Sequence, residues 1–174
     1  INILDGCKEN KIKELYLASS SEVYQTPKKI PTDESEMLKV PDVHNPRYSY
    51  GGGKILTEIM GVNYGKKFFK KLIIFRPHNV YGSDMGNEHV IPEFINRFKH
   101  LKTNYFRIQG SGNETRSFIY IDDFVSAFNL LLKKGKHLGI YNIGTTERIS
   151  IKNLAKMMSN LLNKKIIFKS LPIK

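Results

Sequence analysis

Leu72–Phe75 is an almost unbroken apolar run, Leu-Ile-Ile-Phe, near the middle of the chain. A strand that is covered on both faces of a parallel sheet has this composition, whereas a strand with one wet face alternates polar and apolar residues. Similar short runs at 15–18 and 140–143 are separated from it by stretches with helical spacing, at 48–66 and 122–134. Alternating strand and helix patterns predict a doubly wound parallel sheet, and therefore an α/β fold.

The second half of the chain adds further elements. Helices are expected at 89–100 and 150–163, and strands at 105–109 and 166–168. We expect residues 1–82 to belong to the sheet and residues 83–174 to form mainly a small α/β subdomain, with 117–143 returning to the sheet. The stretch 25–46 has four prolines and no periodicity, which predicts a long loop of the kind that is usually functional or mobile.

The chain has 174 residues and a single cysteine, Cys7. One cysteine cannot form an intramolecular disulfide, and it fits a reducing compartment, so we expect a cytoplasmic protein. No apolar run approaches the roughly 18 residues that a membrane helix needs. We therefore expect no membrane partner.

The net charge of +12 is spread over lysine pairs along the chain, such as Lys28-Lys29, Lys66-Lys67, Lys70-Lys71 and Lys164-Lys165. A nucleic-acid-binding protein usually gathers such charge on one element and carries a matching motif. No such motif is present, so a solvated basic surface that attracts an anionic substrate is the better interpretation. A nucleic-acid binder is the weaker alternative, and we expect no nucleic-acid partner.

Tyr50 and Lys54 are four residues apart within a predicted helix, so they share one helix face. A free phenol, with a pKa of about 10, is a poor base at neutral pH. An ammonium group one turn away stabilises the phenolate, and a serine hydroxyl from the stretch 18–24 could add a second stabilising contact. The pair is a candidate proton-transfer site, although the same spacing also occurs by chance on amphipathic helices.

The same helix has an expected apolar stripe made of Ile55, Leu56, Ile59, Met60 and Val62. Its start holds Gly51–Gly53, and three glycines cost a helix roughly 2.5 to 3 kcal/mol relative to alanine. Such a cost indicates a close approach to the backbone, by a ligand or by a partner helix at a dimer interface. A flexible helix start that packing compensates is the alternative.

Five stretches occur in an order that resembles the extended short-chain dehydrogenase/reductase family, and most closely its NAD-dependent nucleotide-sugar epimerases and dehydratases. They are Ser19-Ser20-Ser21-Glu22-Val23-Tyr24, Tyr50 to Lys54, Arg76-Pro77-His78-Asn79-Val80-Tyr81-Gly82, Arg116-Ser117-Phe118-Ile119-Tyr120-Ile121-Asp122-Asp123 and Ile140-Tyr141-Asn142-Ile143-Gly144. The resemblance covers nearly the whole chain. It implies a Rossmann-type sheet, in which 1–82 is the C-terminal part of the dinucleotide-binding domain and 83–174 is mainly a substrate-binding subdomain.

The resemblance implies transient oxidation of a sugar hydroxyl with NAD as cofactor, while NADP stays open. Tyr50 would be the base, Lys54 would activate it and hold the cofactor ribose, and Ser20 would be the catalytic hydroxyl. Ser19, Pro77 and His78, together with Tyr50 and Lys54, would border the cofactor. We expect no metal, because no cluster of His, Cys or carboxylate residues has metal-ligand spacing.

Glu22 follows Ser20 by two residues, so on an extended chain both side chains would point to the same side. In similar dehydratases and decarboxylases a glutamate at this position handles a C–H proton. One dehydratase branch carries Asp-Glu where this chain has Ser21-Glu22, so Ser21 departs from that pattern. Epimerase, dehydratase and decarboxylase therefore stay open, as does a solvated Glu22 without a catalytic role.

A nucleotide-diphosphate sugar is the substrate that the resemblance implies. Asn79 and Ser21 would contact it, and Val90 and Ile91 would line the nucleotide pocket. Arg116 would clamp the diphosphate, a role that suits a guanidinium fork.

The chain lacks the Gly-x-x-Gly-x-x-Gly turn that holds a cofactor pyrophosphate at a helix N-terminus, and also the acidic residue for the ribose. We interpret the chain as the C-terminal portion of an enzyme that is a homodimer when complete. By itself it is expected to be a catalytically incomplete nucleotide-sugar-binding or dimerisation fragment.

Overall fold

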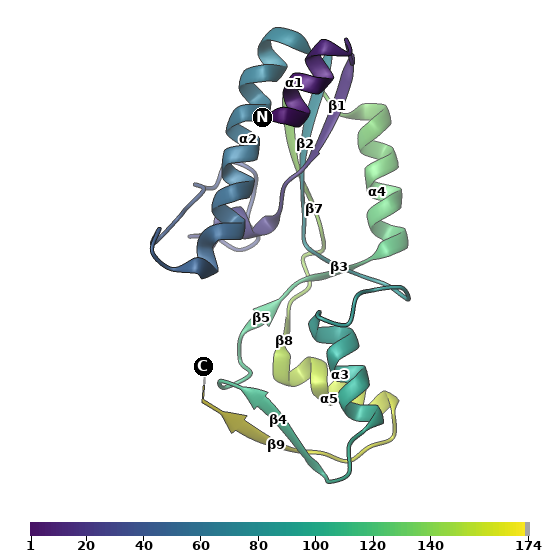
Figure 1. The fold of residues 1–174 in the computed structure, drawn as a ribbon. Helices are drawn as coiled ribbons and strands as arrows, with labels where there is room; N and C mark the ends of the chain where they lie inside the picture. The colour runs from purple at the N-terminus through teal and green to yellow at the C-terminus, as the bar shows by residue number, and fades with distance from the viewer. Residues whose placement is uncertain (173–174) are drawn as a thin grey trace. The chain divides into compact units, whose positions relative to one another are not determined.

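The computed structural model describes residues 1–172, and these form two compact units. The first unit comprises residues 1–78 and 122–144, and the second comprises residues 79–121 together with the chain from 145 onward. The path of the chain is shown in Figure 1.

A three-stranded parallel sheet forms the centre of the first unit, in the order β1 (Glu14–Ala18), β2 (Lys71–Pro77) and β7 (Gly139–Ile143). Helices α1 (Asn2–Glu9) and α2 (Ser49–Phe68) lie on one face of this sheet, and α4 (Ile121–Lys134) lies on the other (Figure 1). The α/β fold with parallel strands that the sequence predicts is therefore confirmed.

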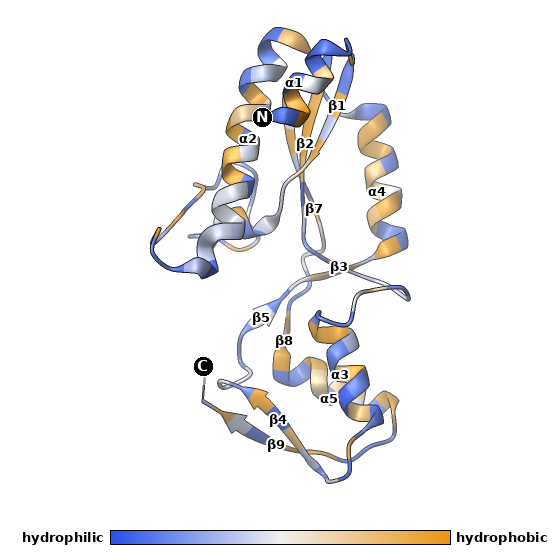
Figure 2. Cartoon of the chain, in the orientation of Figure 1, coloured by the Kyte–Doolittle hydropathy of each residue, from blue (hydrophilic) through white to orange (hydrophobic). Residues whose placement is uncertain are grey.

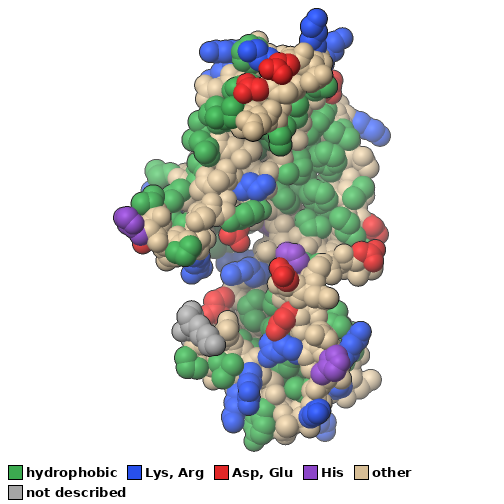
Figure 3. Space-filling view, viewed as in Figure 1, with side chains coloured by type: hydrophobic (Ala, Val, Ile, Leu, Met, Phe, Trp, Pro, Cys, Tyr) green, Lys and Arg blue, Asp and Glu red, His purple; other side chains and the backbone are tan. Residues whose placement is uncertain are grey.

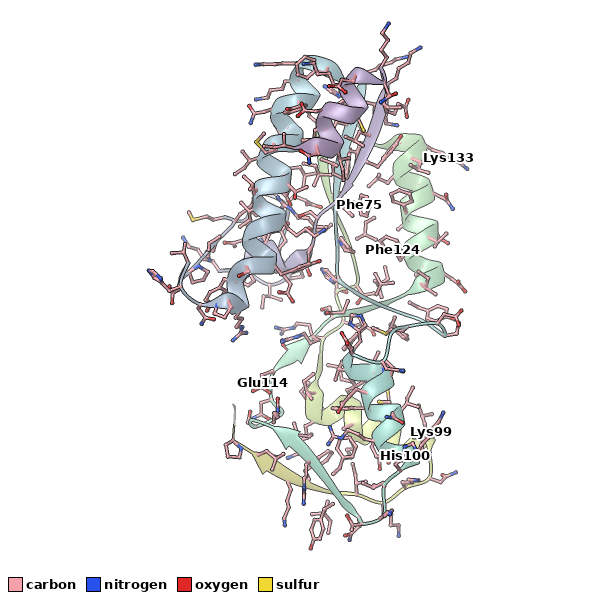
Figure 4. The ribbon with its side chains drawn as sticks, in the orientation of Figure 1. Phe75, Lys99, His100, Glu114, Phe124 and Lys133 are labelled. Carbon is pink, nitrogen blue, oxygen red and sulfur yellow. The ribbon has the colours of Figure 1, made fainter. Side chains whose placement is uncertain are left out.

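The middle strand β2 is apolar along most of its length (Figure 2) and buried on both faces. Leu72 and Ile74 pack with α1 and α2 in one apolar cluster. On the opposite face, the Phe75 ring lies 6.2 Å from the Phe124 ring of α4 (Figure 4). Successive side chains of a strand point to opposite faces, so an unbroken apolar run was needed to fill both layers.

Helix α2 turns an unusual face to the sheet. Its buried residues are Gly51, Glu58, Gly61 and Gly65. A Cβ atom at Gly61 would lie 2.3 Å from Cδ1 of Leu17, so a larger residue there would require the Leu17 side chain to move. The expected apolar stripe was wrong in part, because Leu56 and Ile59 are 59% and 52% exposed.

Up to residue 172, the second unit contains two helices, α3 (Val90–Lys99) and α5 (Ile151–Leu161), and three small sheets. Its strand pairs are β4 (Tyr105–Gln109) with β9 (Ile167–Leu171), β3 (Asn79–Tyr81) with β6 (Phe118–Tyr120), and β5 (Thr115–Arg116) with β8 (Ile149–Ser150). The core is aromatic, and the Phe98 and Phe106 rings stack with centroids 4.4 Å apart.

Two short 3₁₀ helices flank the long loop of the first unit, η1 (Ser21–Tyr24) and η2 (Pro46–Tyr48). Between them, residues 25–45 contain neither helix nor strand, as the prolines predicted. Ser150 caps α5, because its hydroxyl accepts a hydrogen bond from the Asn153 N–H at 3.1 Å.

Lysine and arginine side chains are scattered over the face seen in Figure 3 and do not gather in one field. None of the helices within residues 1–172 has the length and apolar character needed to cross a membrane.

Candidate active site

Lys54 links the start of α2 to the end of β1. Its Nζ atom donates a hydrogen bond to the Ala18 carbonyl oxygen at 2.9 Å. The same Nζ atom lies 5.6 Å from the centroid of the Tyr50 ring. Tyr50 is 56% exposed, so its phenol is accessible while the ammonium group beside it is fixed to the sheet.

Ser20 lies at the carboxyl end of β1 and is the N-cap of η1. Its hydroxyl oxygen accepts a hydrogen bond from the Glu22 N–H at 3.2 Å, which leaves the hydroxyl hydrogen free to donate. Ser20 is buried, and Glu22 is exposed. The carboxyl ends of parallel strands are where ligands bind in open α/β sheets.

The expectation that Ser20 and Glu22 point to the same side of an extended chain was wrong. Ser20 is extended, with φ −158° and ψ 151°, but the chain then enters the 3₁₀ helix η1. The cause is local, since the Ser20 hydroxyl captures the Glu22 N–H and thereby bends the backbone. Ser21 and Glu22 are part of η1 and not of a strand.

The first turn of α2 packs directly against η1, and Gly51 makes this possible. A Cβ atom at Gly51 would lie 3.1 Å from the Glu22 carbonyl oxygen and 2.7 Å from Nε2 of Gln25. A Cβ at Gly53, by contrast, would meet no atom within 4 Å. The close approach that the glycines indicated is therefore made, at Gly51, by this chain's own backbone.

A buried ion pair lies beneath these groups. The Arg76 guanidinium at the end of β2 donates two hydrogen bonds to the Glu58 carboxylate of α2, from Nε at 2.8 Å and from Nη2 at 2.6 Å. Glu58 and Arg76 are only 4% and 2% exposed. Burial opposes the charge of Arg76, yet the hydrogen bonds to Glu58 and Tyr24 raise the pKa of its guanidinium above the usual value.

Each member of this pair also holds the segment that follows β1. The Ser19 hydroxyl donates a hydrogen bond to Oε1 of Glu58. Nη1 of Arg76 donates to the Tyr24 hydroxyl at 2.6 Å, and Tyr24 in turn donates to Oδ1 of Asn142 at 2.8 Å. Sequence reasoning assigned no role to Glu58, Arg76 or Tyr24, although Glu58 continues the four-residue spacing of Tyr50 and Lys54.

The residues expected to border the cofactor differ in which of their hydrogen-bonding groups already have partners within the protein. The Ser19 hydroxyl donates to Glu58 and its N–H donates to the Phe75 carbonyl, so both of its hydrogens are used. Pro77 ends β2. Next to it, the Nδ1 atom of His78 is buried without a hydrogen-bond partner among the described residues, and burial lowers the pKa of this imidazole.

The residues expected to bind substrate lie in the second unit, apart from Ser21. Asn79 donates a hydrogen bond from Nδ2 to the Ser117 carbonyl at 3.0 Å. Val90 begins α3. Ile91 and Arg116 line the same hollow, of about 880 Å³, which is mainly apolar and has a second arginine, Arg148, in its wall.

Within residues 1–172 no group of three or more His, Cys, Asp or Glu side chains is placed to hold a metal ion.

A parallel sheet with helices on both faces, and polar residues at the carboxyl ends of its strands, defines a Rossmann-type α/β protein. The sequence profile of the NAD dependent epimerase/dehydratase family matches residues 1–144. The chain belongs to this family.

Curated relatives include the dTDP-D-glucose 4,6-dehydratase of Dictyostelium discoideum, which is 35% identical over 91% of this chain and 37% of its own length. The GDP-mannose 3,5-epimerase of Arabidopsis thaliana is 31% identical over 98% of this chain and 46% of its own length. The chain thus spans less than half the length of these relatives.

Solved structures share the fold across nearly the whole chain. The dTDP-glucose 4,6-dehydratase from Streptomyces venezuelae, with NAD bound, has a TM-score of 0.85 at 19% identity and covers 99% of this chain and 51% of its own. The UDP-N-acetylglucosamine 4-epimerase from Methanobrevibacter ruminantium has a TM-score of 0.84 at 25% identity and covers 99% of this chain and 54% of its own.

Proposed function

We propose that this chain carries the catalytic part of an NAD-dependent nucleotide-sugar epimerase or dehydratase, which acts by transient oxidation of a sugar hydroxyl. The observation that carries the proposal is the junction of α2 with the end of β1. There the Lys54 ammonium is fixed on the Ala18 carbonyl beside the accessible Tyr50 ring, and η1 with its N-cap Ser20 lies against the same helix turn. An acid–base group, its activating cation and a hydroxyl donor are thereby gathered at one strand end.

The chain's own residues then have distinct tasks. The Tyr50 phenolate removes the proton from the sugar hydroxyl, and the Lys54 ammonium stabilises the negative charge of that phenolate. The free hydrogen of the Ser20 hydroxyl donates to the same sugar oxygen. In the reverse direction, Tyr50 returns the proton to the oxygen of the ketosugar, so the base is regenerated.

The residues near the end of β2 fit the nicotinamide half of the cofactor. Within residues 1–172 the buried Nδ1 atom of His78 has no hydrogen-bond partner, and the accessible Tyr50 phenol lies next to a fixed ammonium. Lys54, Tyr50, His78 and Pro77 would hold this half of NAD, and Ser19 would contribute only its hydroxyl lone pairs and its carbonyl. When bound, NAD supplies the acceptor for the hydride that leaves the oxidised carbon.

The second unit would bind the nucleotide diphosphate. Its hollow is mainly apolar, as a nucleobase requires, and Arg116 and Arg148 in its wall offer charge for phosphate oxygens. Ser21 and Asn79 would contact the sugar. In this assignment residues 1–82 complete the cofactor-binding domain, and residues 83–174 are mainly the substrate-binding subdomain.

Glu22 bears on the choice between epimerase and dehydratase. It is exposed on η1, and its backbone N–H is held by Ser20. Oxidation of the sugar to a ketone acidifies the neighbouring C–H, and a free carboxylate beside Ser20 is suited to take that proton. The relatives named above are dehydratases and epimerases, so they do not favour the decarboxylase alternative.

We further propose that the complete enzyme is a cytoplasmic homodimer. Leu56 and Ile59 of α2 are more than half exposed, and a second copy of the helix would cover them. Light scattering of the complete protein tests this, and a monomer at micromolar concentration would contradict it.

The test of the function is Tyr50→Phe in the complete enzyme, assayed with a panel of UDP-, GDP-, CDP- and dTDP-sugars. We expect turnover to fall by at least about 10²-fold, because the proton acceptor is lost. Nucleotide-sugar binding should change by less than about threefold, since the substrate-binding groups are unaltered. Tyr105→Phe is a matched control, because Tyr105 is also an exposed tyrosine with a lysine, Lys169, over its ring. Turnover retained in Tyr50→Phe would refute the proposal.

A further inference from the structure

The segment between Ser19 and Tyr24 is held at both of its ends by one buried ion pair. Ser19 at the start of the segment donates to Glu58, and Tyr24 at its end accepts from Arg76. Glu58 and Arg76 are joined by two hydrogen bonds. Between the two attachment points lie Ser20 and Glu22.

The same ion pair reaches the second group of functional residues through α2. Glu58 follows Lys54 by four residues, as Lys54 follows Tyr50, so the three side chains share one helix face. The Lys54 ammonium is bound to the Ala18 carbonyl, directly before the held segment. Helix α2 is therefore hydrogen-bonded twice to the chain at the end of β1, from Lys54 to Ala18 and between Glu58 and Ser19.

We propose that Glu58 and Arg76 are positioning residues, which set the distance between the α2 groups Tyr50 and Lys54 and the β1-end groups Ser20 and Glu22. The proposal rests on the function proposed above. Neither member of the pair needs to touch substrate or cofactor, because each acts through a side chain that it holds.

Packing alone does not account for the pair. Two apolar side chains would fill the same volume without the cost of removing two charges from water. The hydrogen bonds of the pair instead continue outward to polar groups of other segments. Those segments are the turn after β1, through Ser19 and Tyr24, and the long loop, through the Glu34 carbonyl at 3.3 Å from Nη1 of Arg76.

Substitution of Tyr24 removes one of these connections, the hydrogen bond from Arg76 to the Tyr24 hydroxyl. The Tyr24 ring is buried, so Tyr24→Phe keeps the packing and leaves the Glu58–Arg76 bonds in place. Tyr64→Phe is the matched control, because the Tyr64 hydroxyl also donates a partly buried hydrogen bond, to Asp5 at 2.7 Å. Tyr64 lies in the C-terminal half of the same helix, away from the Ser19–Tyr24 segment.

The experiment compares these variants in the complete enzyme, by steady-state kinetics and by amide hydrogen exchange of the segment 18–24. In Tyr24→Phe we expect kcat to fall about 10- to 100-fold, as small misplacements of catalytic groups do. KM for the nucleotide sugar should stay within about threefold of the parent value. Exchange of the Glu22 and Val23 amides should accelerate, since both are hydrogen-bonded to Ser20.

Tyr64→Phe should match the parent in kcat and in exchange of this segment. The positioning role is wrong if Tyr24→Phe keeps the parent kcat, if its kcat falls without faster exchange, or if Tyr64→Phe loses as much activity. These outcomes are separate from failure of the proposed function, which Tyr50→Phe reports. If Tyr50→Phe abolishes turnover while Tyr24→Phe does not affect it, the function stands and the positioning role falls.

Discussion

The Glu58 carboxylate and the Arg76 guanidinium meet side by side, with Nε–Oε1 and Nη2–Oε2 distances of 2.8 and 2.6 Å. This two-bond arrangement is the geometry in which arginine binds a carboxylate most strongly. Because both groups are almost completely buried, removing either partner leaves a charge without compensation in the interior.

We predict that Glu58→Gln lowers the free energy of unfolding by about 3 to 5 kcal/mol, the usual cost of breaking a buried pair on one side. The double variant Glu58→Leu/Arg76→Met should lose less, since it leaves no unpaired charge. Urea unfolding measures both. Glu93→Gln is the control, because Glu93 forms an ion pair with Arg97 at 3.1 Å that is only partly buried. Equal losses in Glu58→Gln and Glu93→Gln would contradict the prediction.

His78 should make stability depend on pH in one direction. Burial lowers the pKa of His78, so the unfolded chain takes up its proton first as the pH falls. The contribution is complete above the unfolded pKa of about 6.5 and is lost as the pH falls towards the lower folded value, with a slope of at most about 1.4 kcal/mol per pH unit. Urea unfolding between pH 7.5 and 5.5 should show a shallower slope for His78→Gln than for the parent. A slope in His78→Gln as steep as that of the parent would contradict the prediction.

The glycines of α2 should separate into two classes. At Gly53 a Cβ atom meets nothing within 4 Å, so Gly53→Ala should stabilise the protein by about 1 kcal/mol through helix propensity. At Gly65 a Cβ would lie 3.1 Å from Cβ of Leu72 and 2.8 Å from Cδ2 of Leu138. Gly65→Ala should therefore destabilise by about 1 to 3 kcal/mol. Thermal unfolding of Gly53→Ala and Gly65→Ala measures both changes in stability. If both variants are stabilised, or both destabilised, the distance between helix and sheet does not determine the effect of the substitution.

Arg116→Lys should weaken nucleotide-sugar binding by about 10- to 100-fold, because a point charge replaces a fork that can hold two phosphate oxygens. Arg116 is exposed, and its Nη1 atom donates to the neighbouring Thr115 carbonyl at 3.0 Å, so stability should be unaffected. Calorimetry with the preferred sugar nucleotide of the complete enzyme tests this. Arg107→Lys, at another exposed arginine of the second unit, is the control. Unchanged affinity in Arg116→Lys would exclude the diphosphate role.

The 174-residue chain alone should bind NAD poorly. Its sequence lacks the glycine-rich turn that holds the pyrophosphate, which is where much of the charge of a dinucleotide is bound. Titration calorimetry of this chain should give no binding in the micromolar range. Micromolar affinity would mean that the residues around Lys54 and His78 bind NAD without the glycine-rich turn.

The larger elements could be predicted because their patterns are long. The apolar run at Leu72–Phe75 and the helix that follows Tyr48 were both located to within a few residues. Strands β3, β5 and β8 were not expected, since segments of two or three residues show no periodicity.

Side-chain partners were harder to predict than elements. Apolar spacing in α2 placed Leu56 and Ile59 wrongly on the buried face, because spacing cannot reveal how closely the helix approaches the sheet at Gly61 and Gly65. The network from Ser19 to Asn142 joins residues separated by as many as 118 positions. Its sequence signal is an acidic residue, Glu58, that follows Lys54 by four residues in a mainly apolar stretch of helix.

Strand β1 occupies an outer position in the order β1-β2-β7, so within residues 1–172 one of its two rows of backbone N–H and C=O groups faces no neighbouring strand. An unpaired strand edge of this type can template the addition of further strands. In a preparation of the 174-residue chain, the free β1 edges of two copies can pair with each other. The extent of this association then depends on protein concentration. We therefore expect the purified 174-residue chain to aggregate at high concentration. A short strand-forming peptide that pairs with this edge should reduce the aggregation.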